Sequence, residues 1–82
     1  MLELPLVVSE WRRNSREVVR VTLDEFQGQA TIDCRCWYVD GEGEYRPSRS
    51  GITLAARHLP MLSKALGEAL SEARRAGLVA DT

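Results

Sequence analysis

The apolar residues of this chain change their spacing once, and that change limits what the chain can fold into. Between residues 18 and 39 they recur at every second position, which is the period of half-buried β-strands. After Pro60 they recur at three- and four-residue spacings, which is the period of an amphipathic helix. We therefore predict an α+β fold in which a curved four-stranded antiparallel sheet, a meander, is followed by one C-terminal helix.

The first two predicted strands carry the clearest alternation. Residues 18–23 place Val19, Val21 and Leu23 on one face and polar Arg20 and Thr22 on the other. After a bend at 24–28, residues 29–39 continue the pattern. One face of the second strand carries Ala30, Ile32, Cys34 and Cys36, and the other carries Thr31, Asp33, Arg35 and Trp37.

A tight turn is expected after the second strand, because Asp40–Gly41 supplies the positive φ angles that a two-residue hairpin turn requires. Residues 44–46 then form a short third strand and 52–54 a short fourth one. Pro47, which cannot donate to the ladder, interrupts the pairing between them.

The helix has recognisable ends. Pro60 suits a first helical turn, and Gly77 suits the position just after the last one. Arg74 and Arg75 lie where the helix dipole is negative. Residues 1–16 show no period, so we predict an N-terminal arm over 1–16 and a single domain over 17–82.

The small size of the chain predicts a partner subunit. A domain of 82 residues buries only about 60% of its unfolded surface, so it usually needs a disulfide, a metal or a second copy. Cys34 and Cys36 are two apart in a strand and cannot bridge without strain, and His58 alone offers no local zinc site. A homodimer through the broad apolar helix stripe is therefore expected, with interface residues Leu62, Leu66, Ala69, Leu70 and Ala73.

Composition excludes some classes of protein and does not favour nucleic-acid binding. The net charge is -1, without the basic excess typical of nucleic-acid partners. Glu3 and Pro5 interrupt the first apolar residues, and no apolar run is long enough for a membrane helix. We expect no membrane association and a cytoplasmic protein with reduced thiols.

The polar face of the sheet nevertheless offers what single-stranded nucleic acids need, namely rings for stacking and cations for phosphates. Arginine suits this role because its planar group pairs with phosphate and also stacks. The alternative is that the rings belong to the core and the arginines to a solvated face. The candidate binding residues are Arg20, Phe26, Arg35, Trp37, Tyr38, Arg46 and Arg49.

Residues 21–54 closely resemble the positive cofactor four family of single-stranded-DNA-binding transcriptional coactivators, without a gap over 34 of the 82 positions. The shared elements are Phe26 with Gly28, Ile32-Asp33-Cys34-Arg35, the Trp37-Tyr38 pair, the acidic turn at 40–44, and Arg46-Pro47-Ser48-Arg49-Ser50-Gly51-Ile52.

This resemblance implies two copies paired through their helices, with a single strand lying across the sheets. It implies that Phe26 and the Trp37-Tyr38 pair stack on bases, and that Arg35, Arg46 and Arg49 contact phosphates. The chain departs from the family in having the aromatic pair in the order Trp then Tyr, so either ring remains a candidate for stacking. Uncharged or acidic residues replace several basic ones, at Asp24, Gln27, Gln29 and Ser50, which predicts weaker binding.

The function expected is sequence-tolerant binding of single-stranded DNA, with RNA as an open alternative, by a coactivator that acts with the transcription machinery. It would lie at the nucleoid of a prokaryote or in the nucleus of a eukaryote. The rival hypothesis keeps the fold and dimer but makes them a protein-interaction scaffold with weak or lost nucleic-acid binding. The sequence contains no recognisable catalytic motif, so we expect no enzyme, metal or cofactor, and inert thiols at Cys34 and Cys36.

Overall fold

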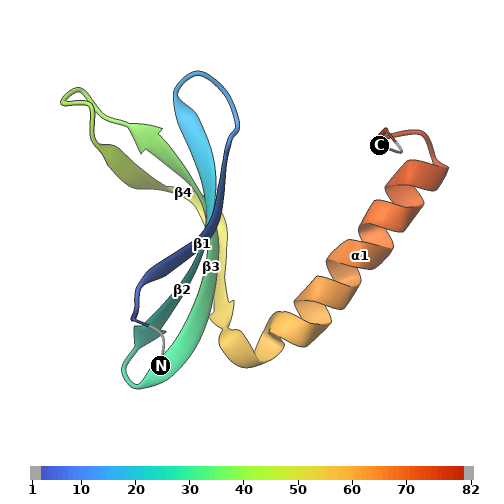
Figure 1. Ribbon diagram of the computed structural model, residues 1–82, viewed down its shortest axis with the longest axis horizontal. Helices are drawn as coiled ribbons and strands as arrows, with labels where there is room; N and C mark the ends of the chain where they lie inside the picture. The colour runs from blue at the N-terminus through green and yellow to red at the C-terminus, as the bar shows by residue number, and fades with distance from the viewer. Residues whose placement is uncertain (1–2, 81–82) are drawn as a thin grey trace.

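The structure is a computed structural model that describes residues 3–80, and it consists of an open sheet followed by a helix (Figure 1). All four strands are antiparallel and neighbours in sequence are neighbours in the sheet, as predicted. The elements in chain order are β1 (Leu6–Arg12), β2 (Glu17–Phe26), β3 (Gln29–Val39), β4 (Tyr45–Ala55), the 3-10 turn η1 (Ala56–His58) and α1 (Leu59–Arg75).

Strand β1 was not predicted. It pairs with β2 from Leu6 opposite Leu23 to Arg12 opposite Val18, with a shift of register between Val7 and Ser9. That irregularity and the apolar run at 6–8 hide the alternation from the sequence. The division into an arm (1–16) and a domain (17–82) stays a prediction, and its boundary falls in the loop between β1 and β2.

The tight two-residue turn lies one hairpin earlier than expected. Gln27 and Gly28, which join β2 to β3, both have positive φ angles, 52° and 79°, as a type I′ turn requires. The chain does double back after β3 as predicted, but the two-residue turn expected at Asp40–Gly41 was wrong, because five residues join β3 to β4. The Asp40 carboxylate accepts the backbone N–H groups of Glu42 and Glu44, which holds the longer loop.

The third and fourth predicted strands are one strand, β4. Pro47 is tolerated because β4 is an edge strand. A bulge interrupts the pairing, since Trp37 lies opposite Pro47 whereas Arg35 lies opposite Gly51. The Ser48 hydroxyl fills the gap by donating to the Cys36 carbonyl at 2.8 Å. The expected interruption at Pro47 is therefore a bulge and not a strand end.

Helix α1 begins one residue before Pro60 and ends as its sequence signals predicted. Gly77 has a φ of 75°, its N–H donates to the Arg74 carbonyl, and the N–H of Leu78 donates to the Ala73 carbonyl. These two bonds form a Schellman motif, which satisfies the last carbonyls of the helix. His58 precedes the helix, and its side chain makes no capping bond.

The single chain buries little apolar surface. Among residues 3–80 the buried apolar side chains are Val18 and Ile32, which lie on opposite faces of the sheet. Helix α1 has no buried residue, and Figure 1 shows it running away from the sheet. The radius of gyration is 14.9 Å, above the value of about 12 Å typical of a compact chain this long. No helix in the described part of the chain is long and apolar enough to cross a membrane.

Candidate nucleic-acid interface

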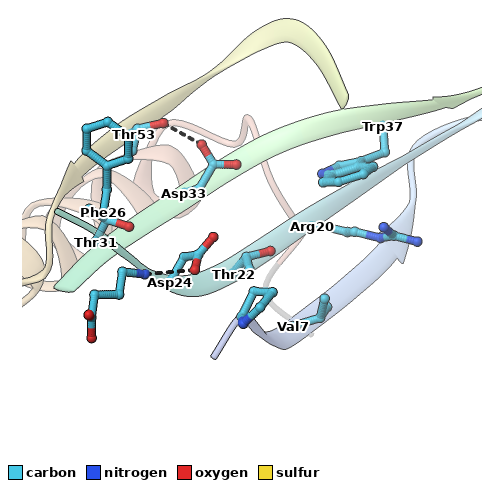
Figure 2. Close-up of a pocket in the computed structure, with 11 residues that line it drawn as sticks. Val7, Arg20, Thr22, Asp24, Phe26, Thr31, Asp33, Trp37 and Thr53 are labelled. Atoms are coloured by element: carbon cyan, nitrogen blue, oxygen red, sulfur yellow. Dashed lines mark hydrogen bonds between the residues drawn. The ribbon is translucent and has the colours of Figure 1, made fainter. Parts of the chain in front are cut away.

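One face of the sheet, here called the pocket face, gathers most of the predicted binding residues. Cross-strand pairs place Arg20 opposite Arg35, Thr22 opposite Asp33, and Asp24 opposite Thr31, and residues directly opposite each other share a face. The pocket face therefore consists of Arg20, Thr22, Asp24 and Phe26 of β2 with Thr31, Asp33, Arg35 and Trp37 of β3. A cavity of about 540 Å³ opens on it (Figure 2), with Pro5, Val7 and Thr53 also in its lining.

Arg20 lies between two aromatic rings of the pocket face. Its guanidinium carbon is 4.5 Å from the centroid of the Trp37 ring and 5.1 Å from that of Tyr45. The Glu10 carboxylate of β1 forms an ion pair with the same guanidinium. Cation–π attraction and the ion pair together hold Arg20 in place, so one face of the Trp37 ring is already covered.

Arg35 is held by neighbours on both sides. Its guanidinium donates to the Asp33 carboxylate at 2.9 Å, to the Thr53 hydroxyl at 3.1 Å, and to the Ser48 carbonyl at 2.9 Å. Hydrogen bonding to Asp33 raises the pKa of Arg35 above its ordinary value. Arg35 therefore fastens the bulged edge strand to β3, and most of its donors are in use.

The absence of a side chain at Gly51 leaves room for Arg35 beside strand β4. A Cβ atom at position 51 would be 2.8 Å from Cβ and Cγ of Arg35 and 2.8 Å from the Cys34 carbonyl oxygen. Real Cβ atoms do not approach other atoms this closely, and a backbone oxygen cannot turn aside. The lack of a side chain at Gly51 is therefore what lets β4 pass over the stem of Arg35.

The remaining predicted arginines lie toward the hairpin between β3 and β4. Arg46 pairs with Asp40 at 2.8 Å, and this hydrogen bond, with those from the backbone of Glu44 and Glu42, lowers the pKa of Asp40 to about 2. The same bond raises the pKa of Arg46. Arg49 lies in the bulge of β4, exposed, and forms no ion pair within residues 3–80.

The predicted aromatic residues do not share one surface. Phe26 is 68% exposed at the end of β2 and lines the cavity with Trp37. Tyr38 follows Trp37 in the strand and therefore points to the opposite face, where it pairs with Arg46 across the sheet. Tyr45, paired with Val39, joins Trp37 on the pocket face instead.

The predicted set is therefore divided. Arg20, Phe26, Arg35 and Trp37 meet on the pocket face, whereas Tyr38 and Arg46 meet on the opposite face. The predicted helix residues Leu62, Leu66, Ala69, Leu70 and Ala73 all lie in α1, where Leu66 is 61% exposed. Alternation in β2 could have added Thr22 and Asp24 to the site, and the predicted returning strand over 44–46 could have added Tyr45. Glu10 depends on the pairing of β1 with β2, which has no sequence signal.

The pocket face is neither strongly basic nor uniformly acidic. The cavity lining holds one guanidinium, Arg20, and three carboxylates, Asp24, Glu25 and Asp33. Flat rings and hydrogen-bonding groups suit a base, whereas the carboxylates repel phosphate. The cavity is therefore suited chemically to a base and not to a phosphate.

Known proteins resemble this chain in sequence and in fold. The family described as transcriptional coactivator p15 (PC4) matches residues 13–65. No curated protein matches the sequence. The crystal structure of a PC4 homologue from Burkholderia pseudomallei is similar in fold, with a TM-score of 0.71, 20% identity, and coverage of 84% of this chain and 93% of the other.

A second crystal form of that protein gives a TM-score of 0.72 at 22% identity, covering 79% of this chain and 96% of the other. A bacteriophage T5 homologue of the eukaryotic coactivator PC4, implicated in recombination-dependent DNA replication, gives 0.69 at 28% identity. That match covers 85% of this chain and 78% of the other. The T5 and Burkholderia proteins share the sheet-then-helix architecture described above.

Proposed function

Because this chain belongs to the family of transcriptional coactivator p15 (PC4), we propose that it binds single-stranded DNA as a homodimer, with a coactivator-like role at the transcription machinery. The family is one of DNA-binding proteins, and the single-strand preference is the finer part of the proposal. The observation that carries it is Phe26, a ring 68% exposed beside a cavity on a sheet face that also presents Trp37.

Stacking supplies the sequence-tolerant part of the binding. A base that stacks on an exposed ring contributes about 1–3 kcal/mol whatever its identity, because every base has a π-face. Phe26 has both the exposure and the position for this. Trp37 lines the same cavity, and the part of its ring that Arg20 does not cover adds to the contact. A duplex keeps its bases paired inside, so the same rings favour single strands.

In this proposal the phosphates bind to Arg46 and Arg49, the exposed arginines near the β3–β4 hairpin. Arg49 has its donors free of carboxylates within the described residues, and Arg46 is paired with Asp40 at the surface. Surface ion pairs contribute little, about 0–1 kcal/mol, so a phosphate can compete for Arg46. Arg35 supports the edge strand in this proposal and adds positive charge behind the bases.

The apolar surface of α1 that the single chain leaves exposed supports the proposed homodimer. Helix α1 has an apolar stripe but no buried residue, and Leu66 and Leu70 are 61% and 41% exposed. Contiguous exposed apolar surface of this kind marks association sites. A second copy is the proposed occupant, with Leu62, Leu66, Ala69, Leu70 and Ala73 in the interface.

Fluorescence anisotropy tests the proposal. Labelled oligo-dT and a duplex of the same length are titrated with the protein at several salt concentrations, and sedimentation gives the mass of the free protein. We expect a dimer that binds oligo-dT more tightly than the duplex, with affinity falling as salt rises. Equal binding to both, or binding to neither, would contradict the proposal.

One observation favours a second candidate, a dimeric protein-interaction scaffold. Three of the four candidate binding arginines, Arg20, Arg35 and Arg46, are paired with carboxylates of the chain itself. A scaffold would form the same dimer but show no binding of oligo-dT at low salt, where phosphate contacts are strongest. The anisotropy titration therefore separates the two candidates.

A further inference from the structure

The cavity on the pocket face contains two buried polar atoms without a hydrogen-bond partner. They are the hydroxyl of Thr22 and the indole nitrogen of Trp37. Thr22 is only 9% exposed, and both residues line the cavity. Figure 2 shows the nitrogen-bearing edge of the Trp37 ring turned toward the side on which Thr22 and Asp33 lie. Buried polar groups nearly always have partners, so these two leave unused hydrogen-bonding capacity in the wall of the cavity, which a ligand or a water molecule can take up once a small side-chain shift exposes it.

Asp24 adds an unbalanced charge to the same cavity. Asp33, the cavity carboxylate on β3, already accepts bonds from Arg35 and from the Thr53 hydroxyl. Asp24 accepts only the N–H of Glu25, at 2.7 Å, and pairs with no cation in the described chain. Its carboxylate therefore offers free acceptor sites to whatever enters.

We propose that this cavity takes one nucleobase turned out of the bound strand, and that it prefers guanine. The proposal rests on the single-strand binding proposed above and adds base selection to it. A cavity of about 540 Å³ lies within the range of roughly 300–1,000 Å³ typical of small-molecule pockets. Phe26 and Trp37 supply ring contacts for the base.

The hydrogen-bonding groups of the cavity select guanine over the other bases. Guanine carries two adjacent donors, N1–H and the N2 amino group, that can meet both oxygens of the Asp24 carboxylate. Adenine and cytosine offer one amino group beside a ring acceptor, and thymine offers one N–H between two carbonyls that the carboxylate repels. The ring acceptors of guanine also remain free for the Trp37 N–H or the Thr22 hydroxyl, once a side-chain shift exposes these buried groups.

The charge of the cavity fits a base and not a phosphate. Asp24, Glu25 and Asp33 repel anions, so the sugar-phosphate backbone stays outside, toward the exposed arginines. The uncharged base is the part of a nucleotide that can enter. Base selection therefore adds to the stacking on Phe26 and does not replace it.

Anisotropy with two oligonucleotides tests base selection directly. One is oligo-dT, and the other is the same length with isolated guanines, which cannot form guanine tetrads. We expect the guanine-containing strand to bind about tenfold more tightly, the scale of a bidentate base contact. Asp24→Asn should abolish that ratio. Glu42→Gln, which removes the same charge in the β3–β4 loop, should keep the ratio.

Nuclear magnetic resonance with free nucleosides separates this proposal from strand binding. The indole N–H signal of Trp37 should shift with deoxyguanosine and not with thymidine. The Trp11 signal, from strand β1 outside the cavity lining, should stay in place with both. An unmoved Trp37 signal together with equal binding of the two oligonucleotides would overturn the guanine site and leave single-strand binding standing. A Trp37 shift without any binding of strands would keep the site and overturn the proposed function.

Discussion

The guanidinium of Arg20 lies over the indole ring of Trp37, 4.5 Å from its centroid. Glu10 holds the guanidinium from β1, and the Tyr45 ring lies on it from the β4 side. One side chain of β2 therefore links all four strands on the pocket face. The buried apolar core is small, so this cluster adds side-chain contacts between strands that the core does not supply.

Replacement of Arg20 by methionine tests that cluster. The apolar stem is kept, but the cation–π attraction and the ion pair with Glu10 are lost. We expect the free energy of unfolding to fall by about 1–2 kcal/mol, more than a surface substitution costs. Urea unfolding measures it, with Arg57→Met in the exposed turn η1 as the matched control. An equal effect of both substitutions would mean that the cluster adds no stability.

The pH dependence of the free energy of unfolding should show how much the ionised Asp40 stabilises the loop between β3 and β4. The pKa of Asp40 falls from 3.8 to about 2 on folding, because Arg46 and two backbone N–H groups hydrogen-bond to its ionised form. A depressed pKa stabilises the fold above the unfolded pKa, and that stabilisation is lost as pH falls through the folded value. Stability should therefore decline between about pH 4 and pH 2.

Asp40→Asn provides the comparison for this pH effect, since it cannot titrate. Denaturant unfolding across the acid range should show a smaller decline in the variant than in the wild type. A direct NMR titration of the Asp40 carboxyl should give a midpoint of about 2. A midpoint at the ordinary value would show that Arg46 does not hold the loop in solution.

Gly51 should not tolerate a methyl group. Alanine there would meet the Arg35 stem and the Cys34 carbonyl oxygen at 2.8 Å. We expect Gly51→Ala to lower the free energy of unfolding by about 1–3 kcal/mol, as overpacked sites do. Thermal unfolding measures the change. Gly28→Ala cannot serve as the control, because the positive φ angle of Gly28 would strain an alanine at that position. Wild-type stability of Gly51→Ala would show that β4 does not pass so close to β3.

Gly67 in α1 offers a contrast that also tests the dimer. In the single chain nothing lies within 4 Å of a Cβ at this position. Alanine should then stabilise the helix by about 1 kcal/mol. If a second backbone approaches at Gly67, the same substitution should weaken the dimer instead. Sedimentation of Gly67→Ala over a range of concentrations distinguishes the two results.

Much of the fold could be predicted from the sequence, because the spacing of apolar residues and the residues that end a helix are local features. The change from strand alternation to helical spacing predicted the sheet and the helix, and Gly77 predicted where the helix ends. The bulge opposite Cys36 was not readable, because it depends on how Ser48 and Arg35 bond across two strands. Strand β1 lacked a regular period, so its pairing with β2 could only come from the folded structure.

Part of the candidate site could also be predicted from the sequence, because the alternation of side chains along a strand is a local feature. Alternation placed Arg20 and Trp37 on one face correctly, since each strand has a fixed period of two. The same rule separates Tyr38 from Trp37, so the adjacent rings cannot serve one surface. The pairing of Arg20 with Glu10 required knowledge of β1, and sequence alone left that arginine free for phosphate.

The most direct test of the central claim, that the pocket face carries the single strand, is the affinity of Phe26→Ala for oligo-dT. Phe26 is 68% exposed, so its removal should leave urea unfolding almost unchanged while it removes a stacked base worth about 1–3 kcal/mol. We expect binding to weaken by about tenfold, and Phe26→Tyr, which keeps a ring, to bind like the wild type. Wild-type affinity in Phe26→Ala would contradict the claim.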